Sequence, residues 1–434
     1  MRIAHALLAV GMSLPCAATA AAQTVSGQPT TDPSSSQPSP PTEPTPPPTP
    51  VPTPEPTPAP EAAPAPVPEP VTPEPASPAD TKPAEEPPAA PLIDAYGFIR
   101  LDAIWEDSRL SNIQFPFFAN SEADDEDPEY SIHPRLTRAG LNLTPFDLTS
   151  SAKLGGKVEI DFQNGGRESR ELPRLRHGYF TLTVDTFELL VGQTWDLMGP
   201  LFPSANADSL MWNAGNVGDR RPQMRATVSP AVGSGTLRLA VMVGQTGAVD
   251  GQDVDMDMRL DGQDGLPTAQ ALVELKMAPI TAGVWGHAAR ETVGDVDFNS
   301  EAIGAHAKLD IGDKAMVQGE IWYGQELSDV RGAIGQAANG MGDEIAAAGG
   351  WIEAAVKLVP DATTAVGFTI DDPVDDDLDA GQRSRNYVAY LVETVKLGKA
   401  FEVGAEYLFW TTDYLEAEKG RVNRFVVHLT AFFD

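Results

Sequence analysis

The 434-residue sequence contains one cysteine, Cys16, which lies within the first 22 residues. Without another cysteine, the rest of the chain forms no disulfide and no thiolate metal site. The six histidines show no metal-ligand spacing, and no glycine-rich phosphate loop is present. We therefore expect no cofactor, no metal site and no enzymatic activity. The formal net charge of -32 disfavours nucleic-acid binding.

Long apolar runs are also missing, so no transmembrane helix is expected, because such a helix needs about 20 mostly apolar residues. The one short run, Ala6 to Leu14, follows Arg2 and precedes the small residues Ala20 to Ala22. This pattern predicts a cleaved signal peptide over residues 1–22. Cys16 directly follows Pro15, a poor context for lipid attachment, which leaves a lipoprotein as the minor alternative.

Aromatic residues are absent from residues 23–91, where 26 of the 40 prolines lie. Such a segment buries too little apolar surface to fold and populates extended polyproline conformations. We expect residues 23–93 to form a disordered, proline-rich periplasmic spacer. The alternative is a strut that contacts the cell wall, with peptidoglycan as its partner.

From residue 94 onward the sequence alternates with a period of two residues. In residues 152–163, Leu154, Val158 and Ile160 fall on one face, whereas Lys157 and Glu159 fall on the other. Such alternation fits either a soluble β-sandwich or a transmembrane β-barrel. The charged polar face, the alternation of short and long turns, and aromatic residues at strand ends favour the barrel. These aromatic residues are Tyr96, Trp105, Trp322, Tyr323, Trp351, Tyr407, Trp410, Phe432 and Phe433.

The fold class is therefore all-β, an antiparallel transmembrane barrel over residues 94–434 in a Gram-negative outer membrane. Because the strand number is even, the N-terminal segment and the C-terminus both lie in the periplasm. The expected sixteen strands are 95–106, 132–143, 152–163, 173–184, 186–195, 220–229, 235–245, 268–278, 280–290, 301–310, 314–324, 349–359, 362–371, 385–396, 401–411 and 422–433. The alternation slips around His177 in the fourth strand.

Residues 196–219 form a loop that is too long for a tight hairpin and too apolar for a solvated one. A sixteen-stranded barrel has a wide lumen, so a selective pore needs a constriction. We expect this third outer loop to fold inward, pack its apolar residues on the inner wall and hold acidic residues near the channel axis. The alternative places the loop over a subunit contact. The expected constriction residues are Asp196, Asp208, Trp212 and Asp219.

Five motifs in this order resemble the DcaP-like family of trimeric outer-membrane porins, over residues 95 to 245. They are Tyr96–Asp102, Leu136–Leu141, Leu175–Tyr179, Gly192–Trp195 and Arg221–Arg225. The resemblance implies a homotrimer of sixteen-stranded barrels, embedded in outer-membrane lipid, that passes small anionic solutes such as dicarboxylates. The proline-rich segment departs from the family, which tends to carry a coiled-coil segment there.

Basic residues dominate the polar face of the first seven strands. The expected pore-lining residues are Arg100, Arg138, Lys153, Lys157, Arg174, Arg176, Arg221, Arg225 and Arg238. These side chains either attract carboxylates or pair with lumen acids to stiffen the wall. Acidic runs such as 371–379 are expected to be solvated loop surface. The sequence thus predicts a porin for small anions; the alternative is a structural protein that tethers the membrane to the cell wall.

Overall fold

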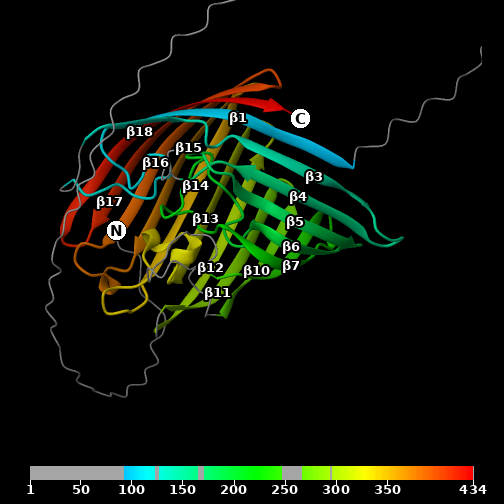
Figure 1. Ribbon diagram of the computed structural model, residues 1–434, viewed down its shortest axis with the longest axis horizontal. Coiled ribbons are helices and arrows are strands. Elements are labelled where there is room, and N and C mark those ends of the chain that lie inside the picture. The colour runs from blue at the N-terminus through cyan, green and yellow to red at the C-terminus, as the bar shows by residue number, and fades with distance from the viewer. Residues whose placement is uncertain (1–91, 123–126, 165–170, 247–265, 294–295, 434) are drawn as a thin grey trace, which may run out of the picture. The chain divides into compact units, whose positions relative to one another are not determined.

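The computed structural model describes residues 92–122, 127–164, 171–246, 266–293 and 296–433, which form a β-barrel (Figure 1). Eighteen strand segments join in one sheet. The first segment, β1, pairs with β3 on one side and with the last segment, β18, on the other, so the sheet closes on itself. Closure removes every free strand edge, which a β structure in a membrane requires.

Three short 3-10 helices lie in the loops between strands. Among the described residues, no helix is long and apolar enough to cross a membrane. The elements in chain order are β1 Ile93–Glu106, β2 Glu129–His133, β3 Arg138–Asp147, β4 Lys153–Asp161, β5 Arg174–Val184, β6 Phe187–Trp195, β7 Arg220–Val228, β8 Ala231–Val232, β9 Gly235–Gly244, β10 Leu266–Met277, β11 Ile280–Val293, β12 Val296–Ile311, β13 Ala315–Gln325, η1 Ser328–Val330, η2 Ala333–Gly335, β14 Ala346–Val359, β15 Ala362–Pro373, η3 Asp375–Asp377, β16 Arg383–Leu397, β17 Phe401–Tyr414 and β18 Ala417–Phe433.

Two of these segments are parts of longer strands. Both β2 and β3 pair with β1, and both β7 and β8 pair with β9, so the barrel has sixteen strands, as predicted. The predicted continuous strand 132–143 is interrupted at 134–137. Pro134 has no amide hydrogen to donate to the ladder, and the Thr137 amide donates back to the Pro134 carbonyl at 2.9 Å, closing a turn.

The two rims of the barrel differ in their connections. At one rim, here the short-turn rim, connections such as 185–186 and 278–279 contain only a few residues. The opposite loop rim carries the long connections 107–128, 196–219 and 326–345. The start of β1 and the end of β18 both lie at the short-turn rim, because Gly97 pairs with Phe433.

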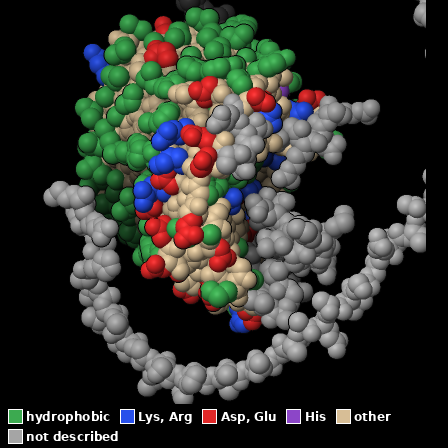
Figure 2. Space-filling model, turned by 90° about the vertical axis from the view of Figure 1, so that its left-hand side faces the viewer, with side chains coloured by type: hydrophobic (Ala, Val, Ile, Leu, Met, Phe, Trp, Pro, Cys, Tyr) green, Lys and Arg blue, Asp and Glu red, His purple; other side chains and the backbone are tan. Residues whose placement is uncertain are grey.

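Apolar side chains cover much of the outer surface, and charged ones gather on another part of it (Figure 2). Trp105, Tyr323, Tyr407 and Phe433 are exposed there, as an interfacial aromatic belt requires. Phe432 is also exposed, but it shares its strand face with His428 and Thr430, which point into the barrel, so the prediction was wrong for this residue. The prediction was also wrong for the other four aromatic residues. Strand alternation turns them into the barrel, where they lie at least half buried: Tyr96, Trp322, Trp351 and Trp410.

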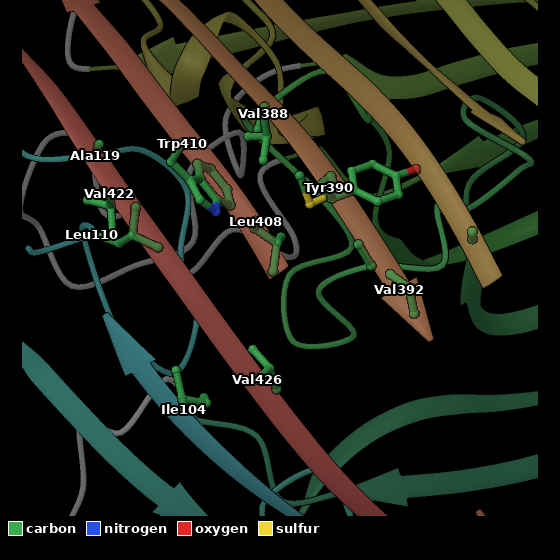
Figure 3. Close-up of a cluster of buried hydrophobic side chains, with 14 of the residues drawn as sticks. Ile104, Leu110, Ala119, Val388, Tyr390, Val392, Leu408, Trp410, Val422 and Val426 are labelled. Carbon is green, nitrogen blue, oxygen red and sulfur yellow. The ribbon is translucent and has the colours of Figure 1, made fainter. Parts of the chain in front are cut away.

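The buried apolar core lies inside the barrel, between the wall and loops that fold inward. One cluster joins Leu110 and Met211, from two loops, to Val388, Leu408 and Trp410 on β16 and β17 (Figure 3). A second cluster joins loop residues 197, 198, 327, 330 and 345 to the wall of β9 to β14. This packing holds the loops inside the lumen because it buries apolar surface that water would otherwise contact.

The predicted signal peptide and the spacer up to residue 91 lie outside the described residues. The closed pairing begins at Ile93, so the barrel contacts described above need no residue before it. We therefore expect a variant lacking residues 23–91 to fold and to keep the heat-modifiable gel mobility of a barrel. Loss of the folded band in this variant, while the full chain retains it, would contradict the spacer interpretation.

Candidate functional site

Loop 3, residues 196–219, runs inside the barrel. Its ends meet at β6 and β7, where the Asp196 amide donates to the Asp219 carbonyl at 2.8 Å and the Asp219 amide donates to the Asp196 carboxylate at 3.0 Å. Away from this root, the loop contacts side chains on five strands around the sheet, which only a segment in the lumen can reach. These partners are Gln270 on β10, Glu320 on β13, Glu353 on β14, Glu406 on β17 and Arg424 on β18.

A second long connection, residues 326–345, also lies inside the barrel and is here called the inner loop. Its Arg331 guanidinium contacts the Asp219 carboxylate at 2.9 Å, and its Val330 carbonyl accepts the Gly218 amide at 2.8 Å. Sequence reasoning missed this loop. Its apolar residues Leu327 and Ile334, both fully buried, were the available signal, because a solvated loop rarely carries them.

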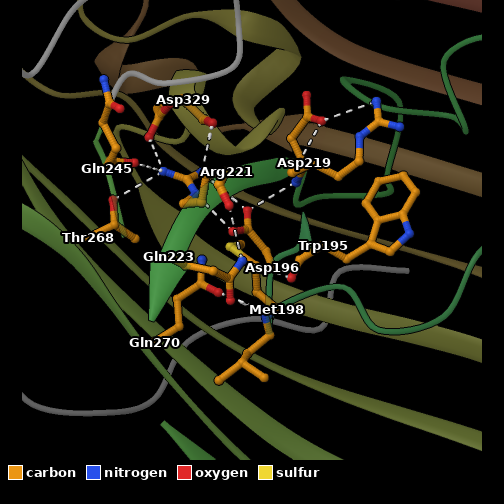
Figure 4. Close-up of polar contacts among 12 residues, drawn as sticks. Trp195, Asp196, Met198, Asp219, Arg221, Gln223, Gln245, Thr268, Gln270 and Asp329 are labelled. Carbon is orange, nitrogen blue, oxygen red and sulfur yellow. Dashed lines mark hydrogen bonds and ion pairs between the residues drawn. The ribbon is translucent and has the colours of Figure 1, made fainter. Parts of the chain in front are cut away.

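Arg221 joins the two loops to β7 (Figure 4). Its guanidinium contacts Asp196 of loop 3 at 2.8 Å and Asp329 of the inner loop at 2.6 Å. It also donates to Thr268 at 3.1 Å and to the Gln245 carbonyl at 2.9 Å. The side chain is fully buried. Arg221 was predicted to line the pore, and this was wrong, because both carboxylates and the loops enclose it.

Five other predicted basic residues lie in ion pairs whose acid is the more deeply buried partner. Asp102, Glu159, Asp161 and Glu274 have side-chain exposures of only 1%, 3%, 0% and 4%. Their basic partners keep 12% to 30% of the side chain exposed: Arg100, Arg138, Lys157, Arg174 and Arg238. Lys153 is exposed near the short-turn rim. These charged side chains share the inner face of their strands, and we call this face the basic wall.

The slip around His177 is a register shift between β4 and β5, opposite Glu159 and Ile160. This β-bulge turns two successive side chains inward, as a residue inserted into one strand does. Arg176 contacts Glu159 and Asp161, each at 2.8 Å, and His177 lies 3.0 Å from the Thr194 hydroxyl. Arg176 is therefore mostly buried beneath the more exposed basic residues.

Arg225 also lies deeper than a pore-lining residue should. Its guanidinium donates to the Gln223 amide oxygen at 2.8 and 3.0 Å and to the Trp195 carbonyl, and the residue is 8% exposed. It ties β7 to the root of loop 3 through these neutral acceptors, whereas the alternative expectation was a pairing with lumen acids. Of the nine predicted pore-lining residues, Arg176, Arg221 and Arg225 are thus engaged in the wall itself.

The predicted constriction residues are all buried, so loop 3 does not present acidic charge to the channel axis as expected. Asp196 pairs with Arg221, Asp219 with Arg331, and Asp208 with Arg424 at 3.0 Å. Burial raises the pKa of Asp208 to about 7, although the charge of Arg424 lowers it. Arg424 also pairs with Glu106. Trp212 packs on Phe115 and under the Arg331 guanidinium, whose carbon lies 5.4 Å from its ring.

Asp371 corrects another expectation, because it is fully buried and not part of a solvated surface. The neighbouring Asp375 and Asp376 are exposed, as expected of an acidic loop. In the part of the chain that the structure describes, no group of three or more His, Cys, Asp or Glu side chains is arranged to hold a metal ion.

Arg220 is a basic residue of the lumen that sequence reasoning missed. Its guanidinium lies 4.5 Å above the Trp195 ring, and its nearest acid, Asp219, is 3.8 Å away. Strand alternation with Arg221 facing inward predicts that Arg220 faces outward. At the transition from loop 3 to β7 the alternation fails, and both side chains are buried inside.

No protein-family model and no curated protein matches the sequence. Among solved structures, the barrel is similar to the outer membrane channel DcaP of Acinetobacter baumannii, with a TM-score of 0.65 and 19% identity over 79% of this chain and 97% of that chain. It is also similar to the anion-selective porin from Comamonas acidovorans, with a TM-score of 0.55 and 13% identity over 79% and 99% of the two chains. For OmpF of Salmonella typhi the TM-score is 0.52, with 12% identity over 79% and 97%.

At these identities the similarity establishes the fold. The chain has the sixteen-stranded barrel fold of outer-membrane porins, and the resemblance to DcaP-like porins predicted from its motifs is confirmed at this level.

The burial of Arg221 makes it a test of the loop root. Arg221→Gln leaves Asp196 and Asp329 buried without their cation, which costs on the order of 3–5 kcal/mol. We expect this variant to lower the thermal unfolding temperature of the detergent-solubilised barrel strongly. Arg138→Gln is the matched control, because Glu159 keeps Arg176 and Lys157 as partners. Equal unfolding temperatures for the two variants would contradict the assigned role.

Proposed function

We propose that the protein is an outer-membrane porin, a passive channel rather than an enzyme, for small hydrophilic anions of the carboxylate type. Loop 3 is its constriction. The fold supports the channel, since the similar structures are outer-membrane porins and channels. The single observation that carries the anionic preference is the difference in exposure within the lumen ion pairs, where the base faces the solvent and the acid lies beneath it.

A wall built in this way attracts anions although its charges are paired. A solute carboxylate contacts the exposed guanidinium edges of Arg138 and Arg174, whereas Glu159 and Asp161 are too deep for a cation to reach. At about 4 Å two unit charges interact by about 1 kcal/mol in water and about 4 kcal/mol at an effective dielectric constant near 20. Arginine also grips a carboxylate through two parallel hydrogen bonds.

The proposal places the barrel in the outer membrane of a Gram-negative cell, after removal of residues 1–22. In such barrels the short turns face the periplasm. The spacer before β1 and the C-terminus after β18 then both lie in the periplasm, because both chain ends of the barrel are at the short-turn rim. Peptidoglycan is the partner proposed for the spacer.

Neutralising the exposed basic residues tests the anionic preference. In the triple variant Arg138→Gln, Lys157→Gln and Arg174→Gln, the buried acids keep Arg176, which contacts both Glu159 and Asp161. We therefore expect the barrel to fold, while the anion-over-cation permeability ratio falls by about tenfold or more, since each removed charge contributes on the order of 1 kcal/mol. The measurement is the reversal potential in a planar bilayer under a salt gradient.

Lys419→Gln is the matched control, because this exposed lysine sits at the loop rim and pairs with Asp413. It should leave the reversal potential nearly unchanged. A cation-preferring unmodified channel would reject the anionic assignment, and a folded protein without conductance would favour the tether that joins membrane and cell wall.

We also propose a homotrimer, as the resemblance to DcaP-like porins implies. The apolar outer surface of the barrel supplies faces for both lipid and neighbouring subunits. Light scattering in mild detergent, corrected for the bound detergent, is expected to give three times the chain mass. A monomeric mass under conditions in which the channel conducts would reject the trimer and leave the channel assignment intact.

A further inference from the structure

Four carboxyl side chains face the lumen from β13, β14, β15 and β17, at a distance in sequence from the basic wall. We call them the acid row: Glu320, Glu353, Asp371 and Glu406. Each is at least 95% buried, with exposures of 2%, 0%, 0% and 5% in that order. An uncovered row of carboxylates in an aqueous lumen would attract cations, so the groups that cover it decide what a solute meets.

Each member of the acid row accepts a backbone amide from an inward-folded loop. Loop 3 supplies the amides of Leu201 to Glu320, Ser204 to Glu353 and Asn206 to Glu406, each at 2.7 Å. The inner loop supplies the amide of Ile334 to Asp371 at 3.1 Å. The Ser204 hydroxyl adds a second bond to Glu353 at 2.9 Å. An amide that donates to an ionised carboxylate forms a hydrogen bond about twice as strong as a neutral one.

The sequence of loop 3 suits this arrangement. Pro200 and Pro203 have no amide hydrogen and a fixed φ, so they favour an extended segment whose remaining amides are free to meet the wall. Gly199 begins the segment with a φ of 55°, and a Cβ there would lie 2.0 Å from the Val217 carbonyl oxygen. Only glycine fits this close approach without displacement of the backbone.

We propose that loop 3 and the inner loop act as an electrostatic cover over the acid row, and that the anion preference of the channel depends on this cover as well as on the basic wall. The effect on selectivity rests on the proposed function. The cover itself consists of loop contacts and does not depend on that function. It gives loop 3 a second role, because the same segment that narrows the lumen also removes three of the four contact sites for cations, and the inner loop removes the fourth.

The cover works by distance. A cation in contact with a carboxylate lies about 4 Å from its charge, and the interaction falls as the separation grows and as salt screens it. A loop backbone with its side chains keeps permeating ions outside that contact distance. On the basic wall, by contrast, the side chains of Arg138 and Arg174 remain 25% and 30% exposed.

The test compares two channels with a shortened loop 3. The first replaces residues 200–206 by Gly-Gly-Ser and keeps the root, in which Asp196 and Asp219 hold Arg221 and Arg331. The second adds Glu320→Gln, Glu353→Gln and Glu406→Gln. We expect the first channel to lose about tenfold of its anion-over-cation permeability ratio, and the second to regain most of it. Equal losses in both channels would mean that the shorter loop merely widens the pore, which would overturn the proposal.

The three glutamine substitutions in the channel with an intact loop give the reference. Their effect on the reversal potential is expected to be several times smaller than in the shortened channel. An equal effect would show that permeating ions interact with the acid row even when loop 3 is intact, which would overturn the proposal. Glu402→Gln is the matched control, because Glu402 shares the lumen face of β17 but is only partly buried, near the short-turn rim. Its effect should not depend on loop length.

Ser204→Pro, with and without Glu353→Gln, repeats the comparison at one site if the shortened channel does not fold, since proline removes the amide and the hydroxyl that Glu353 accepts. Restored anion preference in the double variant supports the proposal, and an equal loss in both variants overturns it.

Failure of the proposed function and failure of the cover can be told apart. A cation preference of the unmodified channel rejects the anionic function, whereas the difference between the paired variants reports the cover whatever that preference is.

Discussion

A charge that is withdrawn from water must be compensated within the protein, and this constraint governs the interior of the barrel. The wall compensates its acids in two ways. On β4, Glu159 contacts Arg138 and Asp161 contacts Arg174, and both arginines remain partly exposed. On β13 to β17, loop backbone amides contact the carboxyl groups and cover them. The two sides of the lumen therefore compensate their acids with different groups.

The inward loops form one unit with the wall because ion pairs and apolar contacts both join them to it. Arg221 ties loop 3 to the inner loop, and Arg331 ties the inner loop back to Asp219. Beside these ion pairs, Leu197 of loop 3 and Leu327 of the inner loop lie in one apolar cluster with residues of the wall. Movement of one loop would therefore expose apolar surface and separate buried charges on the other. This coupling favours loops that are fixed to the wall over a mobile lid.

The strands were predictable from sequence because a period of two residues is a local property, and Leu154, Val158 and Ile160 display it without reference to the rest of the chain. The partners of the charged residues were not. Arg138 and Arg221 look alike in sequence, yet the Arg138 side chain is 25% exposed and the Arg221 side chain is enclosed by two carboxylates. One of these carboxylates belongs to Asp329, which lies 108 positions from Arg221 in the chain. Alternation also fails where a strand becomes a loop, which hid Arg220.

Net charge is a poor guide to selectivity in such a protein. The chain carries 62 acidic and 30 basic residues, which by composition alone predicts attraction of cations. A permeating ion responds mainly to charges within about a Debye length, roughly 8 Å at physiological salt. Within that distance of the basic wall, the exposed groups include Arg138 and Arg174, while Glu159 and Asp161 are buried. In the function that we propose, selectivity follows from the difference in exposure between paired charges, a quantity that depends on folding and is absent from composition.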